Sequence, residues 1–183
     1  APVSDAPSAG FVTGSTMGSS VPLKVSWCGA TASGSSVKSY RVVRSTNGGT
    51  TYSSTPIVTS SSTSSTRSVT VGTSYRWMVR TNDTAGRTGA YATSLVSRVS
   101  RWQETSSAIA YSSGWKTASS SRYSGGKERY VAKTGATATL SVGNVRQFAI
   151  VASKGSSRGS FHVYVDGKRV TTSAISQRAS SAS

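Results

Sequence analysis

The strongest constraint on the fold is an alternating run in the last third of the chain. Residues 157–170 read SRGSFHVYVDGKRV, in which Phe161, Val163 and Val165 alternate with other side chains. Such period-2 alternation is typical of a strand with one buried face. An Asp-Gly pair follows directly, and it is a strong hairpin signal because a type I′ turn needs a positive φ at both central residues. The chain is therefore expected to pair its strands through tight antiparallel turns.

Composition extends this expectation to the whole chain. Only 14% of the 183 residues are charged and 35% are hydrophobic, while Ser, Thr and Gly are abundant. Few charges argue against a helical protein, whereas Val, Thr, Tyr and Trp suit strands, and Gly and Ser suit turns. The length allows one large domain or two ordinary ones. We predict an all-β fold made of two tandem β-sandwiches.

Short alternating segments separated by turn residues fill the first hundred residues. We expect a linker over residues 1–9 and a first domain over residues 10–99. Its strands are expected at residues 10–16, 21–27, 39–45, 51–58, 67–71, 75–82 and 90–99. The low-complexity run TSSSTSST at residues 59–66 is interpreted as a mobile loop. Short strands at a spacing of about 8–12 residues are typical of a Greek-key sandwich.

Two stretches of this first domain carry a family resemblance. WCGATASGSSVKSYRVVRSTNGGTTY and VGTSYRWMVRTNDTAGRTGAY resemble a fibronectin type III domain of the kind common in secreted bacterial proteins. Trp27 matches the buried tryptophan of the second strand, and Tyr75 matches the tyrosine that anchors the turn before the sixth strand. The resemblance covers residues 8–99. It implies a fold and no activity, because such domains are mainly spacers and interaction modules.

A second domain is expected over residues 105–176, after a linker at residues 100–104. Its strands before the final hairpin are expected at residues 105–111, 129–132, 136–142 and 147–153. The pattern ETSSAIAYSSGWKTASSSRYSGGKERYVAKTGATATLSV, followed by VRQFAIVASKGSSRGSFHVYVDGKRV, is similar to a jelly-roll module of the galactose-binding-like type. That resemblance implies attachment to a surface or a carbohydrate.

This second domain is short of strands for the fold that it resembles. A jelly roll needs about eight strands to close its two sheets, whereas the chain offers six or seven before a disordered-looking tail at residues 177–183. We therefore expect an incomplete jelly roll. An open sheet presents unpaired N–H and C=O groups, which a donated strand can fill. Self-assembly through an open sheet edge is thus a candidate interaction.

Groups that carry catalysis are scarce. His162 is the only histidine, and it lies in the middle of a predicted strand. Glu104 and Glu128 are the two carboxylates that might meet, but bases surround each of them and favour ion pairs. Cys28 is the only cysteine and is interpreted as a small buried hydrophobic side chain. Phosphate-binding glycine motifs and clustered metal ligands are missing from the sequence. We expect a non-enzymatic protein without a cofactor or metal.

Charge is the most unusual property of the chain. There are 21 Lys and Arg against 5 Asp and Glu, which gives a formal net charge of +16. The excess is spread over both halves, and such a field attracts polyanions such as nucleic acid, anionic cell-wall polymers and acidic glycans. The alternative is that scattered bases only keep a Ser-rich surface soluble. No run of about 18 apolar residues is present, so we expect no transmembrane segment. A first residue other than Met favours a processed secreted protein, or a fragment of a longer one.

Candidate binding residues follow from this charge. Arg41, Arg76 and Arg80 alternate with apolar residues and are expected on one exposed sheet face, although long arginines also splay into water and cover apolar neighbours. In the second domain, aromatic residues lie next to cations in loops, and such rings stack on sugars or bases. The candidates there are Trp115, Lys116, Arg122, Tyr123, Lys127, Arg129, Lys154 and Arg158. A packing role is the alternative for Trp115 and Tyr123.

The favoured interpretation is a non-catalytic secreted or cell-surface module that binds an anionic polymer or glycan, or that tethers a larger assembly. One alternative is a structural subunit of an extracellular filament or phage-tail-like appendage, assembled by β-strand exchange. The other is a nucleic-acid-binding protein that uses its charge without sequence preference.

Overall fold

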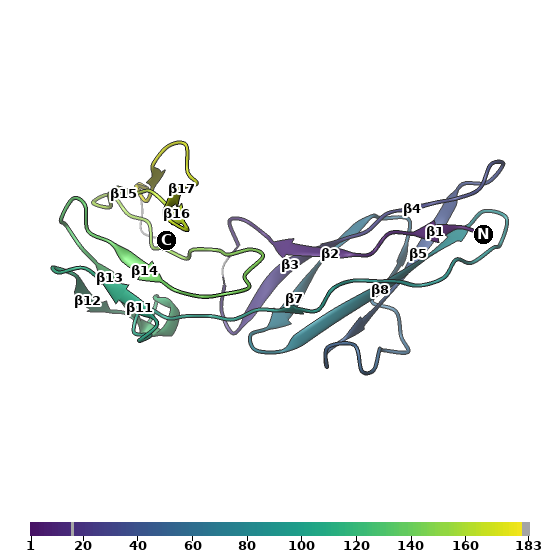
Figure 1. Ribbon diagram of the computed structural model, residues 1–183, viewed down its shortest axis with the longest axis horizontal. Coiled ribbons are helices and arrows are strands. Elements are labelled where there is room, and N and C mark those ends of the chain that lie inside the picture. The colour runs from purple at the N-terminus through teal and green to yellow at the C-terminus, as the bar shows by residue number, and fades with distance from the viewer. Residues whose placement is uncertain (16, 181–183) are drawn as a thin grey trace.

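The computed structural model describes residues 1–15 and 17–180 and confirms an all-β protein. Strands hold 41% of the chain and helix only 2%. Figure 1 shows an elongated molecule with the N-terminal half at one end and the C-terminal half at the other. Among the described residues, no helix is long and apolar enough to cross a membrane.

Two sheets form the N-terminal half. The first has the order β2-β3-β7, and its strands are β2 (Ser8–Phe11), β3 (Ser20–Ser26) and β7 (Ser64–Thr70). The second has the order β10-β8-β5-β6, with strands β5 (Val37–Ser45), β6 (Val58–Ser60), β8 (Ser74–Asp83) and β10 (Ser97–Arg98), and with β9 (Ala92–Thr93) also paired to β8. A small ribbon joins β1 (Val3–Ser4) to β4 (Gly29–Ala30). All of these pairings are antiparallel.

A single hydrophobic core lies between these two sheets. Val25 from β3 and Val69 from β7 meet Val42 from β5 and Trp77 from β8, and all four are fully buried. They share one side of their strands because successive side chains alternate between the two faces. The N-terminal half is therefore a β-sandwich in which period-2 alternation sets the inner face.

Aromatic residues of the core make two further contacts. The Trp27 and Tyr40 rings meet edge to face with centroids 6.4 Å apart. The Thr70 N–H donates a hydrogen bond of 2.9 Å to the Tyr75 hydroxyl across the turn between β7 and β8. Burial opposes ionisation of Tyr75, but the hydrogen bond from Thr70 and the nearby Arg44 hold its pKa below the ordinary value. Trp27 and Tyr75 thus lie buried at the positions that the sequence pattern indicated.

The loop expected at residues 59–66 is confined to residues 61–63, and the rest of the prediction is wrong. Residues 59–60 belong to β6, and residues 64–66 begin β7, where they pair with the second half of β3. A ladder is built from backbone hydrogen bonds, and Thr is a good strand residue, so repetitive composition does not prevent pairing. The expected strand at residues 90–99 is likewise divided into β9 and β10, and the expected linker at residues 1–9 contributes β1 and the start of β2.

The C-terminal half consists of two-stranded ribbons. Its strands are β11 (Ile109–Tyr111), β12 (Lys116–Ser119), β13 (Lys127–Tyr130), β14 (Ala138–Leu140), β15 (Ser160–Phe161), β16 (Tyr164–Val165), β17 (Lys168–Arg169) and β18 (Ile175–Ser176), with one 3₁₀ turn, η1 (Ser124–Gly126). The pairs are β11-β14, β12-β13, β15-β18 and β16-β17. The Asp-Gly hairpin is confirmed, because Asp166 and Gly167 have φ values of 49° and 76° and join β16 to β17.

The described residues of the C-terminal half do not form a second core. No described side chain between residues 100 and 180 is fully buried, and the expected strand at residues 147–153 is not a strand. Val165, expected on a buried face, is 38% exposed. Alternation predicts a buried face only if a second layer covers it, and the paired ribbons present here are too narrow to do so.

The first residues of the expected tail form backbone hydrogen bonds with the rest of the chain. The Gln177 N–H donates to the Gly159 carbonyl, and the Gly155 N–H donates to the Gln177 carbonyl. A parallel bridge also joins Gly155 to Arg178. The end of the predicted tail, residues 181–183, lies outside the described residues.

Two leucines test whether the N-terminal core carries the stability. Leu23 is 4% exposed in the core, whereas Leu95 is 61% exposed in the same half. We expect Leu23→Ala to lower the free energy of unfolding by about 2–5 kcal/mol and Leu95→Ala to change it by less than about 0.5 kcal/mol. Urea unfolding followed by circular dichroism measures both, and equal losses would contradict the assignment of the core.

Candidate functional site

The three arginines predicted on one sheet face lie there. Arg41 on β5 is directly opposite Arg80 on β8 in the antiparallel register, and Arg76 lies four residues before Arg80 on the same strand. Cross-strand partners share a face, and so do residues separated by an even number along a strand. Because Val42 and Val79 point into the core, the arginines point outward. We call Arg41, Arg76 and Arg80 the arginine face.

Hydrogen bonds and the aromatic ring of Tyr91 fix the side chains of the arginine face. Arg41 donates from Nε to the Tyr91 hydroxyl at 3.1 Å and from Nη2 to the Ser54 carbonyl at 2.9 Å. The Arg80 guanidinium carbon lies 5.0 Å from the centre of the Tyr91 ring, within the range of a cation–π contact. Tyr91 therefore joins two like charges that oppose each other across the strands.

Arg76 completes the face at its other end. Its Nε donates to the Ser94 carbonyl at 2.8 Å. Within residues 1–15 and 17–180, neither it nor the other two arginines forms an ion pair with a carboxylate. The Arg80 Nε is buried and has no hydrogen-bond partner among the described atoms, which is an unfavourable state for a charged group. The face thus concentrates positive charge that the described part of the protein does not neutralise.

Only two ion pairs join described side chains. One links Arg87 to Asp83 at 2.7 Å, and the other links Arg158 to Glu128. Burial opposes ionisation of Asp83, but the backbone N–H and the guanidinium of Arg87 outweigh it and hold its pKa below the ordinary value. Because the chain has 21 basic residues, most of its Lys and Arg side chains take no part in these two ion pairs.

Arg158, one of the predicted binding residues, pairs with an acidic side chain. Arg158 donates to Glu128, which also accepts a hydrogen bond of 2.6 Å from the Ser153 hydroxyl. Burial raises the pKa of Glu128, but the Ser153 and Arg158 donors hold it below the ordinary value. The neighbouring Gly155 N–H donates to the Gln177 carbonyl. Arg158 is therefore already paired with a carboxylate of the protein itself.

Trp115 and Arg129 pack around a third residue that the sequence did not single out. The Trp115 and Tyr111 rings meet edge to face with centroids 5.1 Å apart, and Trp115 Nε1 donates to the Thr137 carbonyl. The Arg129 guanidinium carbon lies 4.6 Å from the centre of the Tyr111 ring. Trp115 thus contacts Tyr111 and Thr137, and its role in binding or in packing stays a prediction.

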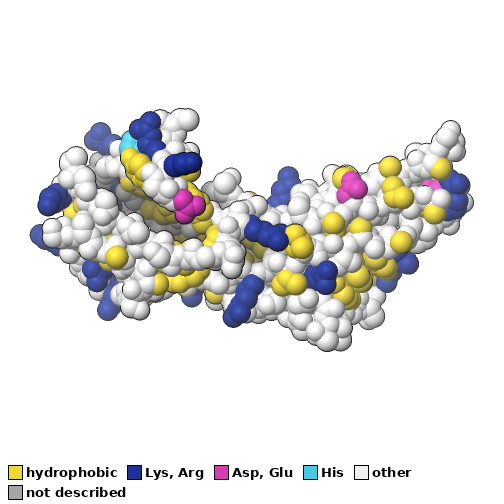
Figure 2. Space-filling model, viewed as in Figure 1, with side chains coloured by type: hydrophobic (Ala, Val, Ile, Leu, Met, Phe, Trp, Pro, Cys, Tyr) yellow, Lys and Arg dark blue, Asp and Glu magenta, His cyan; other side chains and the backbone are white. Residues whose placement is uncertain are grey.

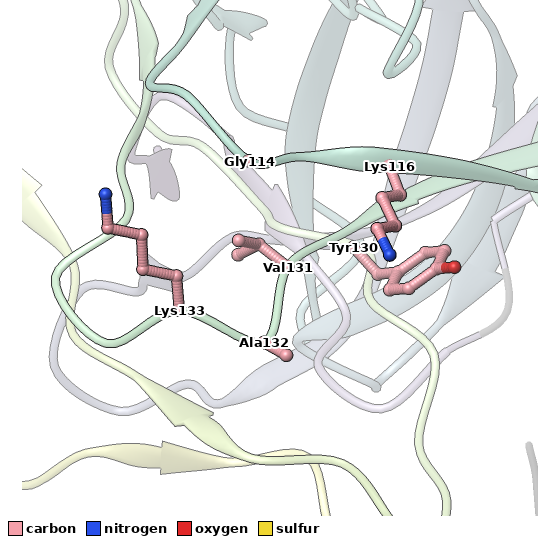
Figure 3. Close-up of a pocket in the computed structure, with 6 residues that line it drawn as sticks. All are labelled: Gly114, Lys116, Tyr130, Val131, Ala132 and Lys133. Carbon is pink, nitrogen blue, oxygen red and sulfur yellow. The ribbon is translucent and has the colours of Figure 1, made fainter.

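Lys116 borders a shallow hollow of about 260 Å³ in the C-terminal half. Figure 3 shows its amine beside the Tyr130 ring, with Lys133 on the other side of Val131. Lys116 lies opposite Tyr130 in the β12-β13 register. Of three further candidates, Arg122 and Tyr123 lie in the connection between β12 and β13, with Tyr123 directly before η1, and Lys127 is the first residue of β13. The structure therefore spreads the candidates of this half over several small sites.

Two residues considered for chemistry lie apart from these sites. His162 is exposed, and its Nδ1 is 3.2 Å from the Thr171 hydroxyl. Cys28, expected to be buried, is exposed and donates from Sγ to Asp5 Oδ2 at 2.8 Å. That hydrogen bond raises the pKa of the Cys28 thiol. The expected burial was wrong because Cys28 follows the end of β3, where the alternation stops. No group of three or more potential metal ligands gathers in the part of the chain that the structure describes.

Comparisons with protein-family models, with curated proteins and with solved structures found no match to this chain. The resemblances to a fibronectin type III domain and to a galactose-binding-like module therefore rest on the residues quoted above. Function has to be argued from the surface of the molecule itself.

Acid titration tests the pairing of Asp83 with Arg87. Because the pKa of Asp83 is lowered in the folded state, the unfolded chain binds more protons in acid, and the stabilisation present at neutral pH is lost as the pH falls. Urea unfolding between about pH 5 and pH 2 should show a steeper loss of stability in the native protein than in an Asp83→Asn variant. Parallel pH profiles for the two proteins would contradict the pairing.

Proposed function

We propose that the protein is a non-catalytic module that binds an anionic polymer, such as an acidic glycan or a cell-wall polymer. The observation that carries this proposal is the arginine face, where three guanidinium groups share one sheet surface without a carboxylate partner among the described residues. Opposed like charges on neighbouring strands are unfavourable. A bound polyanion removes that cost.

The chemistry of the arginine face suits repeated anionic groups. Arginine presents several donors in a planar fork that matches carboxylate, sulfate and phosphate oxygens. Tyr91 and the carbonyls of Ser54 and Ser94 fix the orientation of the guanidinium groups, so less side-chain entropy is lost on binding. A linear polymer that crosses the two strands would contact several arginines at once.

The N-terminal sandwich supports the role of a rigid spacer. Its arrangement of β2-β3-β7 against a sheet centred on β5 and β8 agrees with the fibronectin type III-like architecture suggested by the sequence. The same resemblance, to domains of secreted bacterial proteins, supports a secreted or cell-surface location. Tethering of a larger assembly is compatible with this role, because a spacer holds its neighbours at a fixed distance.

Assembly by strand exchange is a second candidate function. The observation that favours it is the lack of any fully buried side chain in the described residues from 100 to 180. Narrow ribbons of this kind gain stability when further strands cover them. Attachment through the C-terminal half and polymer binding through the N-terminal half are compatible in one protein.

Salt-dependent binding to heparin and to double-stranded DNA tests the polymer-binding proposal. Replacing Arg41, Arg76 and Arg80 together by Gln should weaken heparin binding by about tenfold or more at low salt, because three close contacts are lost. The matched control replaces Lys24, Lys38 and Arg101, three exposed bases that are not part of the arginine face, by Gln. Since it removes the same charge without removing the face, it should weaken binding by about threefold or less.

Equal losses in the two triple variants would show that net charge alone attracts the polymer, and this would overturn the site. Tighter binding to DNA than to heparin at matched salt would favour the nucleic-acid alternative. Binding that does not change with salt would contradict an ionic mechanism altogether.

A further inference from the structure

The region between β14 and β15 contains a segment without partners. Residues 141–154 make no backbone–backbone hydrogen bond to any described residue, and all of them except Ser153 are exposed. Figure 1 draws this region without a strand arrow. The sequence nevertheless predicts a strand at residues 147–153, since QFAIVAS is apolar and contains Phe, Ile and Val. The segment therefore has the composition of a strand, and although the Gln147 side chain lies close to Gly10 of β2, no backbone hydrogen bond joins it to a described strand.

The same segment exposes large apolar side chains. Phe148 and Ile150 are each 54% exposed, and Val151 is 62% exposed. Val142 and Val145 extend the patch toward β14. Figure 2 shows hydrophobic side chains gathered in a hollow beside the lobe that carries β15, β16 and β17, with Lys and Arg side chains and an acidic side chain at its edges. Several large apolar side chains exposed within one short segment are a feature of interaction sites.

One end of the segment is already anchored. The Ser153 hydroxyl donates to Glu128, and the Ser153 carbonyl accepts a hydrogen bond from the Gln177 side chain. These contacts fix the segment beside β13 and beside the residues that follow β18. The backbone N–H and C=O groups of residues 145–152 have no such partners among the described residues. A strand that pairs here would therefore meet a segment that is held at one end.

Charge identifies the partner. Arg146 and Lys154 flank the apolar stretch and are exposed. Residues 101–180 contain twelve bases and three acids, and one of those acids, Glu128, is paired with Arg158. A second copy of the chain would bring another strongly positive surface against this one, which is electrostatically unfavourable. An acidic partner has the complementary charge.

We infer that residues 145–153 accept an extended polypeptide strand from a partner protein, with acidic residues at the ends of that strand. Backbone hydrogen bonds to the segment supply affinity, apolar side chains of the incoming strand cover Phe148 and Ile150, and its acidic ends meet Arg146 and Lys154. This strand-acceptor site is separate from the arginine face and does not depend on the polymer that the arginine face binds.

Hydrogen–deuterium exchange of the full chain tests the site. The probe is a synthetic peptide of alternating valine and threonine, with two glutamates at each end. We expect it to slow exchange of the amides of residues 145–153 by about tenfold or more, because a ladder protects them from solvent. Amides of β8 should keep their rates, which shows that the N-terminal sandwich is unchanged.

Two control peptides distinguish strand pairing from non-specific binding. A version with lysines in place of the glutamates should protect much less at low salt, and a version with two central prolines should not protect, because proline lacks the donor N–H. Equal protection by all three peptides, or none by the glutamate peptide, would overturn the inference. Protection that grows with protein concentration without peptide would show a second copy as the occupant, and would also overturn it.

Two protein variants complete the test. Arg146→Glu combined with Lys154→Glu should reverse the preference, so that the lysine peptide protects better than the glutamate peptide. The triple Gln variant of the arginine face should keep the response of the native protein. If this variant loses polymer binding but keeps the peptide response, the two sites are separate. If it also loses the peptide response, the two sites are not independent.

Discussion

Burial of one face of β8 against the opposite sheet determines most of the structure. Trp77 and Val79 are fully buried and pack against the inner faces of β3, β5 and β7. Each such side chain contributes about 1.5–3 kcal/mol relative to an exposed one, and a slip of one residue would expose the whole set. The register that buries Trp77 and Val79 therefore also places Arg76 and Arg80 on the outer face. The arginine face is thus a consequence of the core, because the strands cannot bury one set of residues without presenting the other.

The C-terminal half shows what happens without such burial. Its ribbons satisfy local backbone hydrogen bonds, but two-stranded ribbons have no second layer to cover their apolar side chains, and an isolated pair is marginally stable in water. The Glu128 cluster, with Ser153 and Arg158, supplies a polar contact between β13 and residues 153–158 in place of a core. Apolar residues such as Phe148 and Val151 consequently face solvent. Both candidate functions of the protein follow from this contrast between a closed half and an open one.

The sequence predicted those features that depend on local periodicity. The strands around Val25, Val42 and Trp77 and the Asp-Gly hairpin could be recognised because alternation and turn chemistry act within a few residues. Features that depend on residues far apart in the sequence could not be recognised in this way. Tyr91 was overlooked because its contacts with Arg41 and Arg80 arise only when β5 and β8 pair, and the Ser/Thr tract at residues 59–66 was assigned to a loop because its partner, β3, lies some forty positions earlier. The open surface of the C-terminal half is likewise a tertiary property, since the alternation of Phe161, Val163 and Val165 does not show whether another layer covers them.

Both the arginine face and the strand-acceptor site depend on a hydrophobic core that lies in the N-terminal half of the chain. Hydrogen–deuterium exchange of the unliganded protein measures this residue by residue. Amides in β3, β5 and β8 should exchange only through cooperative unfolding, and amides of residues 105–176 should exchange orders of magnitude faster. Comparable protection in the two halves of the isolated protein would show a second closed core, and would contradict both the open surface and the strand-acceptor site.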